Sequence, residues 1–258
     1  MGRWVRFARD GAAEFGAVAA DTIAVHRGCM FSGSQPTGEQ VPLESVRLLP
    51  PAEPSKMIAL WNNFRALGTK LGLSAPPEPL YFIKAASSYA GPDARVRRPR
   101  GYDGKVVFEG ELAIVIGATC RDAEPEDAAK AIFGYTCVND ITAADILQKD
   151  ATFAQWTRAK SFDGFSPFGP VIATGLRPEH LTVRTVLNGK ERQNYPIADM
   201  VFPAATLVSL LSRDMTLVPG DMICCGTSLG VGAMREATNV VEVTIGGIGT
   251  LRTFYDNE

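Results

Sequence analysis

Short apolar runs punctuated by turn residues cover most of the chain and predict many strands. Three of them fall within the first 25 residues, at Trp4–Phe7, Phe15–Ala19 and Thr22–Val25. Glycine and aspartate separate them, as in a small β meander. The stretch LLPPAEPSK (residues 48–56) carries three prolines, which is typical of a linker. We therefore expect a small N-terminal β cap over residues 1–50 and a larger domain over residues 51–258.

The first part of the larger domain alternates between strand-like runs and a less regular stretch. Ile58–Leu60 and LYFIKA (residues 80–85) are apolar enough for core strands. Between them, NNFRALGTKLGLSAPPEP (residues 62–79) predicts a short helical or irregular segment that ends at prolines. Such a segment forms either a lid or a plain connection.

Two stretches further along have helical periodicity. PEDAAKAIFGYTC (residues 125–137) begins with proline and has Gly134 near its end, and Ala204–Leu211 is the second. Thr136–Val138 then reads as a brief strand. From Asp163 onward, strand-like runs and glycine turns dominate. The pattern predicts a β-rich α+β fold with few helices.

One strand-like run carries two acids where apolar residues are expected. VFEGELAIVIG (residues 107–117) has Glu109 and Glu111 two positions apart, so in a strand both carboxylates point to the same face. Leu112–Ile116 are apolar on both faces, as in a strand buried on both sides. Like charges beside a core repel, and a hard divalent cation with oxygen ligands would relieve this. The alternative is an edge strand with one solvated face.

Asp140 and Lys160 are further candidates for the same site. Asp140 follows an apolar strand-like stretch and would supply a third carboxylate, although aspartate at a strand end also serves as a turn or cap residue. Lys160 stands in RAKSFDGFSPFGP, near three phenylalanines that would give its ammonium an aromatic wall. The alternative for Lys160 is an ordinary surface lysine.

A glycine-rich stretch, CGTSLGVG (residues 225–232), follows another apolar run. Its backbone amides, together with Thr227 and Ser228, are suited to holding a carboxylate. The stretch matches neither GxGxxG nor a Walker A loop, so it does not indicate a nucleotide.

Composition and charge exclude several function classes. The net charge of −2 gives no electrostatic reason to expect nucleic acid or an anionic membrane as a partner. The two histidines, His26 and His180, lie outside the acid-bearing segments, which argues against a serine triad or a histidine-rich zinc site. The five cysteines form no C-x-x-C pair, so we expect reduced thiols. No signal peptide or membrane span is apparent, and we expect a cytoplasmic protein.

Taken in order, these segments resemble the fumarylacetoacetate hydrolase family. The resemblance covers about Ile58 to Leu251 and rests on a series of motifs. They are FEGELAIVIG, GYTCVNDITA, RAKSFDGFSPFGP, DMVF, SRDMTLVPGDMICCGTSLGVG and IGGIGTL. It implies a mixed β-sandwich roll and a homodimer. It also implies enzymes that bind 2-oxo, diketo or enol acids on Mg²⁺ or Mn²⁺, with Ca²⁺ possible in a crystal.

The same resemblance assigns roles to individual residues. Glu109, Glu111 and Asp140 would be the metal ligands. Lys160 would be the catalytic lysine, and Thr227 would bind substrate. A divalent ion would act as a Lewis acid on an enolate, with Lys160 adding charge or moving a proton.

The chain departs from the family pattern at three positions. Leu67 stands where hydrolytic members carry a lid histidine, with Lys70 near the position of its partner glutamate. Ala144 and Leu147 stand where relatives carry an arginine and a glutamine that grip the substrate carboxylate. The candidates to replace them are Arg65, Lys70, Lys84, Gln148 and Arg158, with Arg65, Lys84 and Ser228 preferred for substrate binding.

Three functions follow from the sequence. The first is metal-dependent hydrolysis of a C–C bond in an acylpyruvate or related diketo acid, in aromatic or sugar-acid catabolism. The second is isomerisation, tautomerisation or decarboxylation of a 2-oxo acid on the same metal site, which the missing lid histidine favours. The third is a non-catalytic binding protein that keeps the metal cage.

Overall fold

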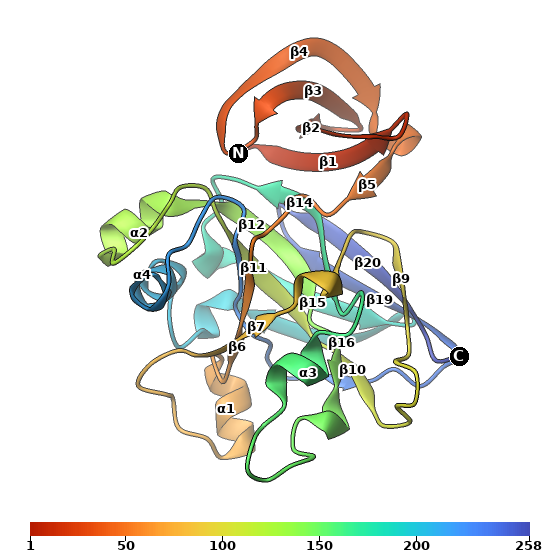
Figure 1. Ribbon diagram of the computed structural model, residues 1–258, viewed down its shortest axis with the longest axis vertical. Helices are drawn as coiled ribbons and strands as arrows, with labels where there is room; N and C mark the ends of the chain where they lie inside the picture. The colour runs from red at the N-terminus through yellow and green to blue at the C-terminus, as the bar shows by residue number, and fades with distance from the viewer.

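A large twelve-stranded sheet joins the N-terminal strands to the rest of the molecule (Figure 1). The computed structural model describes residues 1–258. The spatial order of the sheet is β4 (Ser32–Pro42), β3 (Thr22–Cys29), β2 (Ala12–Ala19), β1 (Arg3–Arg9), β14 (Ser166–Ala173), β12 (Ile132–Asn139), β11 (Gly110–Ile116), β17 (Met222–Cys224), β6 (Met57–Trp61) and β7 (Leu80–Lys84). Two short strands join it at the side, β5 (Arg47–Leu49) on β1 and β8 (Tyr89–Ala90) on β14.

Two smaller sheets complete the β structure. One has five strands, β16 (Lys190–Pro196), β15 (Thr182–Leu187), β19 (Thr238–Ile245), β20 (Gly249–Asp256) and β9 (Ala94–Arg97). The other has three very short ones, β13 (Thr142–Ala143), β10 (Val106–Phe108) and β18 (Gly232–Ala233). In Figure 1 the five-stranded sheet lies alongside β11, β12 and β14, so the two larger sheets enclose the core between them.

The helices are few and short. The α-helices are α1 (Arg65–Leu71), α2 (Pro125–Ala131), α3 (Trp156–Lys160) and α4 (Ala204–Asp214). Single 3₁₀ turns are η1 (Leu43–Ser45), η2 (Ala86–Ser88), η3 (Ala144–Ile146), η4 (Pro178–His180) and η5 (Ile197–Asp199). None of the helices is long and apolar enough to cross a membrane. The predicted β-rich α+β class is confirmed, and so is the predicted helix at α4, while the segment expected to be helical or irregular contains the helix α1.

Strand β11 is the central element of the core. It pairs antiparallel with β12 on one side and β17 on the other, and every one of its residues is buried. Leu112, Ile114 and Ile116 belong to the larger core cluster, while Ala113 and Val115 pack into a second cluster on the opposite face. The prediction of a strand apolar on both faces is confirmed, and each large side chain buried here contributes about 1.5–3 kcal/mol.

The N-terminal strands form the predicted meander, at the top of Figure 1. A fourth strand, β4, extends the meander through serine-, proline- and glycine-containing sequence that gave no strand signal. Strand β1 continues into the main sheet by pairing Arg3 with Ala173 and Trp4 with Ile172. The division of the chain at residue 50 stays a prediction, because the sheet runs across it.

The helix predicted over residues 125–137 is wrong beyond Ala131. The backbone changes to β12 at Ile132, eight residues that run to Asn139 and include the brief strand expected at Thr136–Val138. The β-branched and aromatic residues that follow Ala131 favour a strand. The ladder with β11 then satisfies their backbone groups, and this long-range pairing outweighs the local helical pattern.

The predicted linker is fastened to the main sheet by one buried carboxylate. Asp221 precedes β17 and has no solvent exposure. It accepts hydrogen bonds from Ser55 Oγ (2.6 Å), Lys56 N (3.2 Å) and Val218 N (2.8 Å), and an ion pair from Lys56 Nζ (2.5 Å). These contacts set the start of β6 beside β17, where Met57 and Met222 pair in parallel.

We predict that Asp221→Ala lowers the free energy of unfolding by about 2 kcal/mol or more, because four donors lose a charged acceptor in a buried place. Lys56→Ala is the matched control and should cost less, since Asp221 keeps its other donors. Urea denaturation of both variants measures the difference. Equal, small losses for the two would show that Asp221 does not anchor the linker.

Candidate active site

The two glutamates lie at a break between two strands. Strand β10 ends at Phe108 in the three-stranded sheet, and β11 begins at Gly110 in the large sheet, with Glu109 between them. The single strand predicted over residues 107–117 is therefore wrong at Glu109. The break is held by Asp140, whose N–H donates to Glu109 O (2.8 Å), and by Asn139, whose Oδ1 accepts from Glu109 N (3.3 Å).

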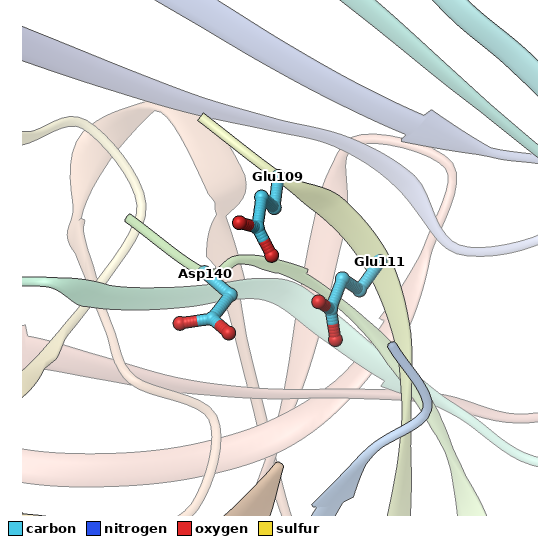
Figure 2. A group of neighbouring side chains, drawn as sticks. All are labelled: Glu109, Glu111 and Asp140. Carbon is cyan, nitrogen blue, oxygen red and sulfur yellow. The ribbon is translucent and has the colours of Figure 1, made fainter. Parts of the chain in front are cut away.

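The three predicted acids nevertheless come together. One carboxylate oxygen from each of Glu109, Glu111 and Asp140 lies within 4.8 Å of the others, and Figure 2 shows the three groups side by side. Glu111 and Asp140 are each 1% exposed, while the Glu109 side chain is 16% exposed. Three negative charges in so small and dry a space repel strongly unless cations compensate them.

Lys160, at the end of α3, supplies one of those cations. Its Nζ donates to Glu109 Oε2 (2.9 Å), Asp140 Oδ2 (2.7 Å) and Thr142 Oγ1 (2.7 Å). The same ammonium lies 5.7 Å from the centre of the Phe82 ring. The predicted aromatic neighbour therefore exists, but it comes from β7.

Lys84, the last residue of β7, supplies the second cation. Its Nζ forms an ion pair with Asp140 Oδ1 and donates to the carbonyl of Phe165 (3.3 Å). The Lys84 side chain has no solvent exposure. Each oxygen of Asp140 thus contacts one lysine. Because Lys84 is fully buried, it positions Asp140 and is not exposed to a ligand.

The electrostatic surroundings of the three acids differ. Burial would raise the pKa of Asp140, but Lys160 and Lys84 together hold it below its usual value. Burial raises the pKa of Glu109, and Asp140 adds to this, while Lys160 opposes it. Burial, Asp140 and Glu109 raise the pKa of Glu111 well above its usual value. Glu111 is the least compensated charge of the cluster.

Glu111 is therefore where a further cation fits. No lysine contacts it, and its carboxylate accepts one hydrogen bond, at Oε2 from Gly226 N (3.0 Å). The remaining donor set is all oxygen, which suits Mg²⁺ or Mn²⁺. Three carboxylates outnumber two ammonium groups by one negative charge. A divalent ion would reverse that sign and leave the site attractive to an anion.

A shared scaffold holds Gly110 between the two glutamates. Gly110 N donates to Gln193 Oε1 (2.9 Å), and Gly110 O accepts from Tyr195 OH (2.6 Å) and Thr227 Oγ1 (3.1 Å). Gln193 Nε2 in turn donates to Thr227 Oγ1 (2.8 Å). A Cβ on Gly110 would lie 2.0 Å from Thr185 Oγ1, so no larger residue fits here. The scaffold ties the glutamates to the glycine-rich loop.

That loop brings the predicted Thr227 and Ser228 to the cluster. Both are buried, and Ser228 Oγ has no hydrogen-bond partner. Arg65, in contrast, uses its guanidinium on the backbone carbonyls of residues 199–201 and makes no contact with the acids. Leu147 packs against the main core, in keeping with its apolar character.

The other proposed replacements for the absent arginine and glutamine lie on the surface. Lys70, Gln148 and Arg158 are exposed. None of them has a hydrogen bond or ion pair with the three acids, whose lysine partners are Lys84 and Lys160.

Sequence reasoning missed three residues that support the site. Gln193 is 1% exposed but sits in RQNYP, a segment without a motif. The Phe82 ring faces the Lys160 ammonium, and Trp156 stacks on Phe82 with ring centres 5.5 Å apart. The one sequence signal for these residues was the alternation of side chains along the strand LYFIKA, which places Phe82 and Lys84 on the same face.

We predict that Gly110→Ala destabilises the protein by about 1–3 kcal/mol, because the methyl group overlaps Thr185 Oγ1 and must push β11 away. Thr185→Ala alone should be nearly neutral, since that hydroxyl has no partner. The double variant should recover part of the loss in thermal unfolding. A double variant no more stable than Gly110→Ala would contradict this origin of the strain.

The comparisons with known proteins agree with this geometry. Residues 56–254 match the family described as fumarylacetoacetate (FAA) hydrolase C-terminal, and residues 2–51 match the one described as Rv2993c-like, N-terminal. The chain is similar to oxaloacetate tautomerase YisK of Bacillus subtilis, with 36% identity over 81% of this chain and 73% of that protein.

Solved structures add two further relatives. The crystal structure of 2-hydroxyhepta-2,4-diene-1,7-dioate isomerase from Mycobacterium marinum has a TM-score of 0.91 and 35% identity, covering 100% of this chain and 99% of that one. Maleylpyruvate hydrolase from Sphingobium sp. SYK-6, solved with manganese(II) and pyruvate, has a TM-score of 0.80 and 27% identity over 99% of both chains. The β-rich sandwich fold is shared with these relatives, and the chain belongs to the fumarylacetoacetate hydrolase family.

Proposed function

We propose that this chain is a divalent-cation-dependent enzyme that interconverts the enol and keto forms of a small 2-oxo acid. The observation that carries the proposal is the acid cluster, in which Glu111 alone lacks a cation while Glu109 and Asp140 are held by lysines. The tautomerase and isomerase relatives, at 36% and 35% identity, support this type of reaction.

In this proposal Glu109, Glu111 and Asp140 hold Mg²⁺ or Mn²⁺. When bound, the ion supplies positive charge for the oxygens of a 2-oxo acid and for the negative charge that develops on enolisation. The relative solved with manganese and pyruvate is consistent with this choice of ion and ligand.

Lys160 is the proposed catalytic residue. Asp140, Glu109 and Glu111 outweigh the effect of burial and raise its pKa, so Lys160 carries a proton at neutral pH. It therefore serves as a proton donor or a fixed positive charge at Nζ rather than as a base. Its contact with Glu109, the most exposed of the three acids, places that proton on the side of the cluster nearest solvent.

The predicted substrate-binding residues separate into two groups. Thr227 and Ser228 stay proposed binders of the substrate carboxylate, and the unpaired Ser228 hydroxyl is available for this. We reassign Lys84 as a positioning residue, because it is fully buried against Asp140. Arg65 stays a prediction from the sequence and would have to leave its backbone carbonyls to reach a ligand.

Hydrolysis of a C–C bond in an acylpyruvate is the second candidate, supported by the maleylpyruvate hydrolase relative. It requires a base for water. His26 packs on Trp4 in the N-terminal meander and His180 lies in η4, so neither imidazole contacts the cluster. The side chain at the lid position is Leu67. The expected homodimer and cytoplasmic location stay predictions.

We predict that Mg²⁺ or Mn²⁺ at one hundred times its dissociation constant stabilises the protein by about 2.7 kcal/mol and raises its melting temperature by about 5 °C or more. Chelation should reverse the shift. Glu111→Gln should abolish it and also raise the melting temperature of the metal-free protein, since the variant removes an uncompensated buried charge. Differential scanning calorimetry measures both effects.

The exposed Glu126→Gln on α2 is the matched control and should respond to metal as the wild type does. If the metal still stabilises the Glu111→Gln protein, the ion binds elsewhere. The acid cluster would then have no part in the proposed function.

We predict that the metal-loaded protein speeds the enol–keto conversion of oxaloacetate, which is measured as the loss of enol absorbance. Lys160→Met should lower the rate of this conversion about a hundredfold or more. Acylpyruvates incubated in parallel should yield no pyruvate. Release of pyruvate and a carboxylic acid would assign hydrolysis instead. A rate that metal and Lys160→Met leave unchanged would contradict both candidates.

A further inference from the structure

A polar cavity that none of the three acids lines lies beside the strand that carries Gln193. It has a volume of about 600 Å³, and its lining includes Lys190, Arg192 and Arg235. Lys190 and Arg192 lie on β16 on either side of Glu191, next to a bulge in its pairing with β15, and both side chains are exposed and line the cavity, while Gln193 is buried. Arg235 reaches the same cavity from the segment after β18.

These three cations have no carboxylate partner. Two exposed arginines elsewhere on the five-stranded sheet are paired, Arg184 with Glu191 (2.6 Å) and Arg252 with Asp93 (2.5 Å). Around the cavity, only Glu236 opposes the three positive charges, and it forms no ion pair with them. A local excess of positive charge around one hollow, on a chain whose net charge is −2, favours an anionic ligand.

The floor of the cavity is rigid. Asn239 has no solvent exposure, accepts from Glu236 N (3.2 Å) and donates to Glu236 O (2.7 Å). Asn188 donates to Asn239 Oδ1 (3.2 Å) and accepts from Val240 N (2.8 Å). These asparagines bond to one another and to the backbone, which leaves recognition of a ligand to the cations at the rim.

We propose that this cavity binds a small oxyanion with at least two negative charges, either a phosphate group or a di- or tricarboxylate. Guanidinium groups bind both kinds of group through paired N–H donors. The cavity is separate from the acid cluster. Its function does not depend on which reaction the acid cluster carries out.

The cavity is connected to the acid cluster through β16 and one loop. A Cβ on Gly230 would lie 1.9 Å from Arg192 O, so the loop after Ser228 presses directly on β16. On the other face of the strand, Gln193 Nε2 donates to Thr227 Oγ1 and to Ser228 O (3.3 Å). An anion bridging Arg192 and Arg235 would therefore hold β16 against the C-terminal end of the loop whose other end, at Gly226, donates to Glu111.

Calorimetric titration of the metal-free protein with phosphate, citrate and chloride at equal ionic strength tests the binding, because citrate chelates Mg²⁺ and a metal-loaded acid cluster would itself attract an anion. We expect one saturable site for phosphate or citrate and none for chloride. Arg192→Gln and Arg235→Gln should each weaken binding about tenfold. The matched control Arg177→Gln, at an exposed arginine outside the cavity, should not change it. Tighter phosphate binding assigns a phosphate ligand, and tighter citrate binding assigns a polycarboxylate.

Glu111→Gln separates this cavity from the acid cluster, since it should leave the anion affinity unchanged. Binding lost in Glu111→Gln but kept in both arginine variants would place the anion at the acid cluster and overturn the proposal. Absence of saturable binding, or dissociation of an oligomer by Arg235→Gln, would overturn it as well. For the loop connection, we expect phosphate or citrate to slow hydrogen exchange at residues 226–228. Unchanged exchange at saturation would refute that connection.

Discussion

The site depends on the neutralisation of buried carboxylates by buried lysines. Asp140 would be hard to keep ionised with 1% exposure if Lys84 and Lys160 did not meet its two oxygens. With Asp140 fixed, Lys160 extends the compensation to Glu109 but stops short of Glu111. One acid is thus left with an excess of negative charge, and in the proposed function this imbalance is what would make the cluster a cation site rather than a closed salt-bridge network.

The fold supplies these groups from segments far apart in the chain. The acids come from one end of the β11–β12 ladder, where Gly110 pairs with Asn139, while Lys84 comes from the edge strand β7 and Lys160 from a short helix. Gln193 reaches across from the second sheet and joins Gly110 to the glycine-rich loop. The cluster therefore sits where the two larger sheets and the three-stranded sheet meet. The positions of the acids therefore depend on the contacts between these sheets.

Local sequence patterns were enough for part of this arrangement. Strand periodicity placed Glu109 and Glu111 on one side, and the apolar run after them indicated burial. The residues that support the acids were harder to predict from local patterns, because Lys84 is 56 positions from Asp140 and Gln193 is 83 positions from Gly110. Periodicity also failed where pairing decided the outcome, in the helix that ends at Ala131 and in the strand that breaks at Glu109.

The most direct test of this account is anomalous diffraction from crystals of the Mn²⁺-loaded protein. The account predicts one manganese peak in contact with Glu109, Glu111 and Asp140. Lys84 and Lys160 should still be bonded to Asp140 in the same map. A peak at any other group of residues, or none at saturating Mn²⁺, would contradict the claim that the uncompensated Glu111 makes this cluster a cation site.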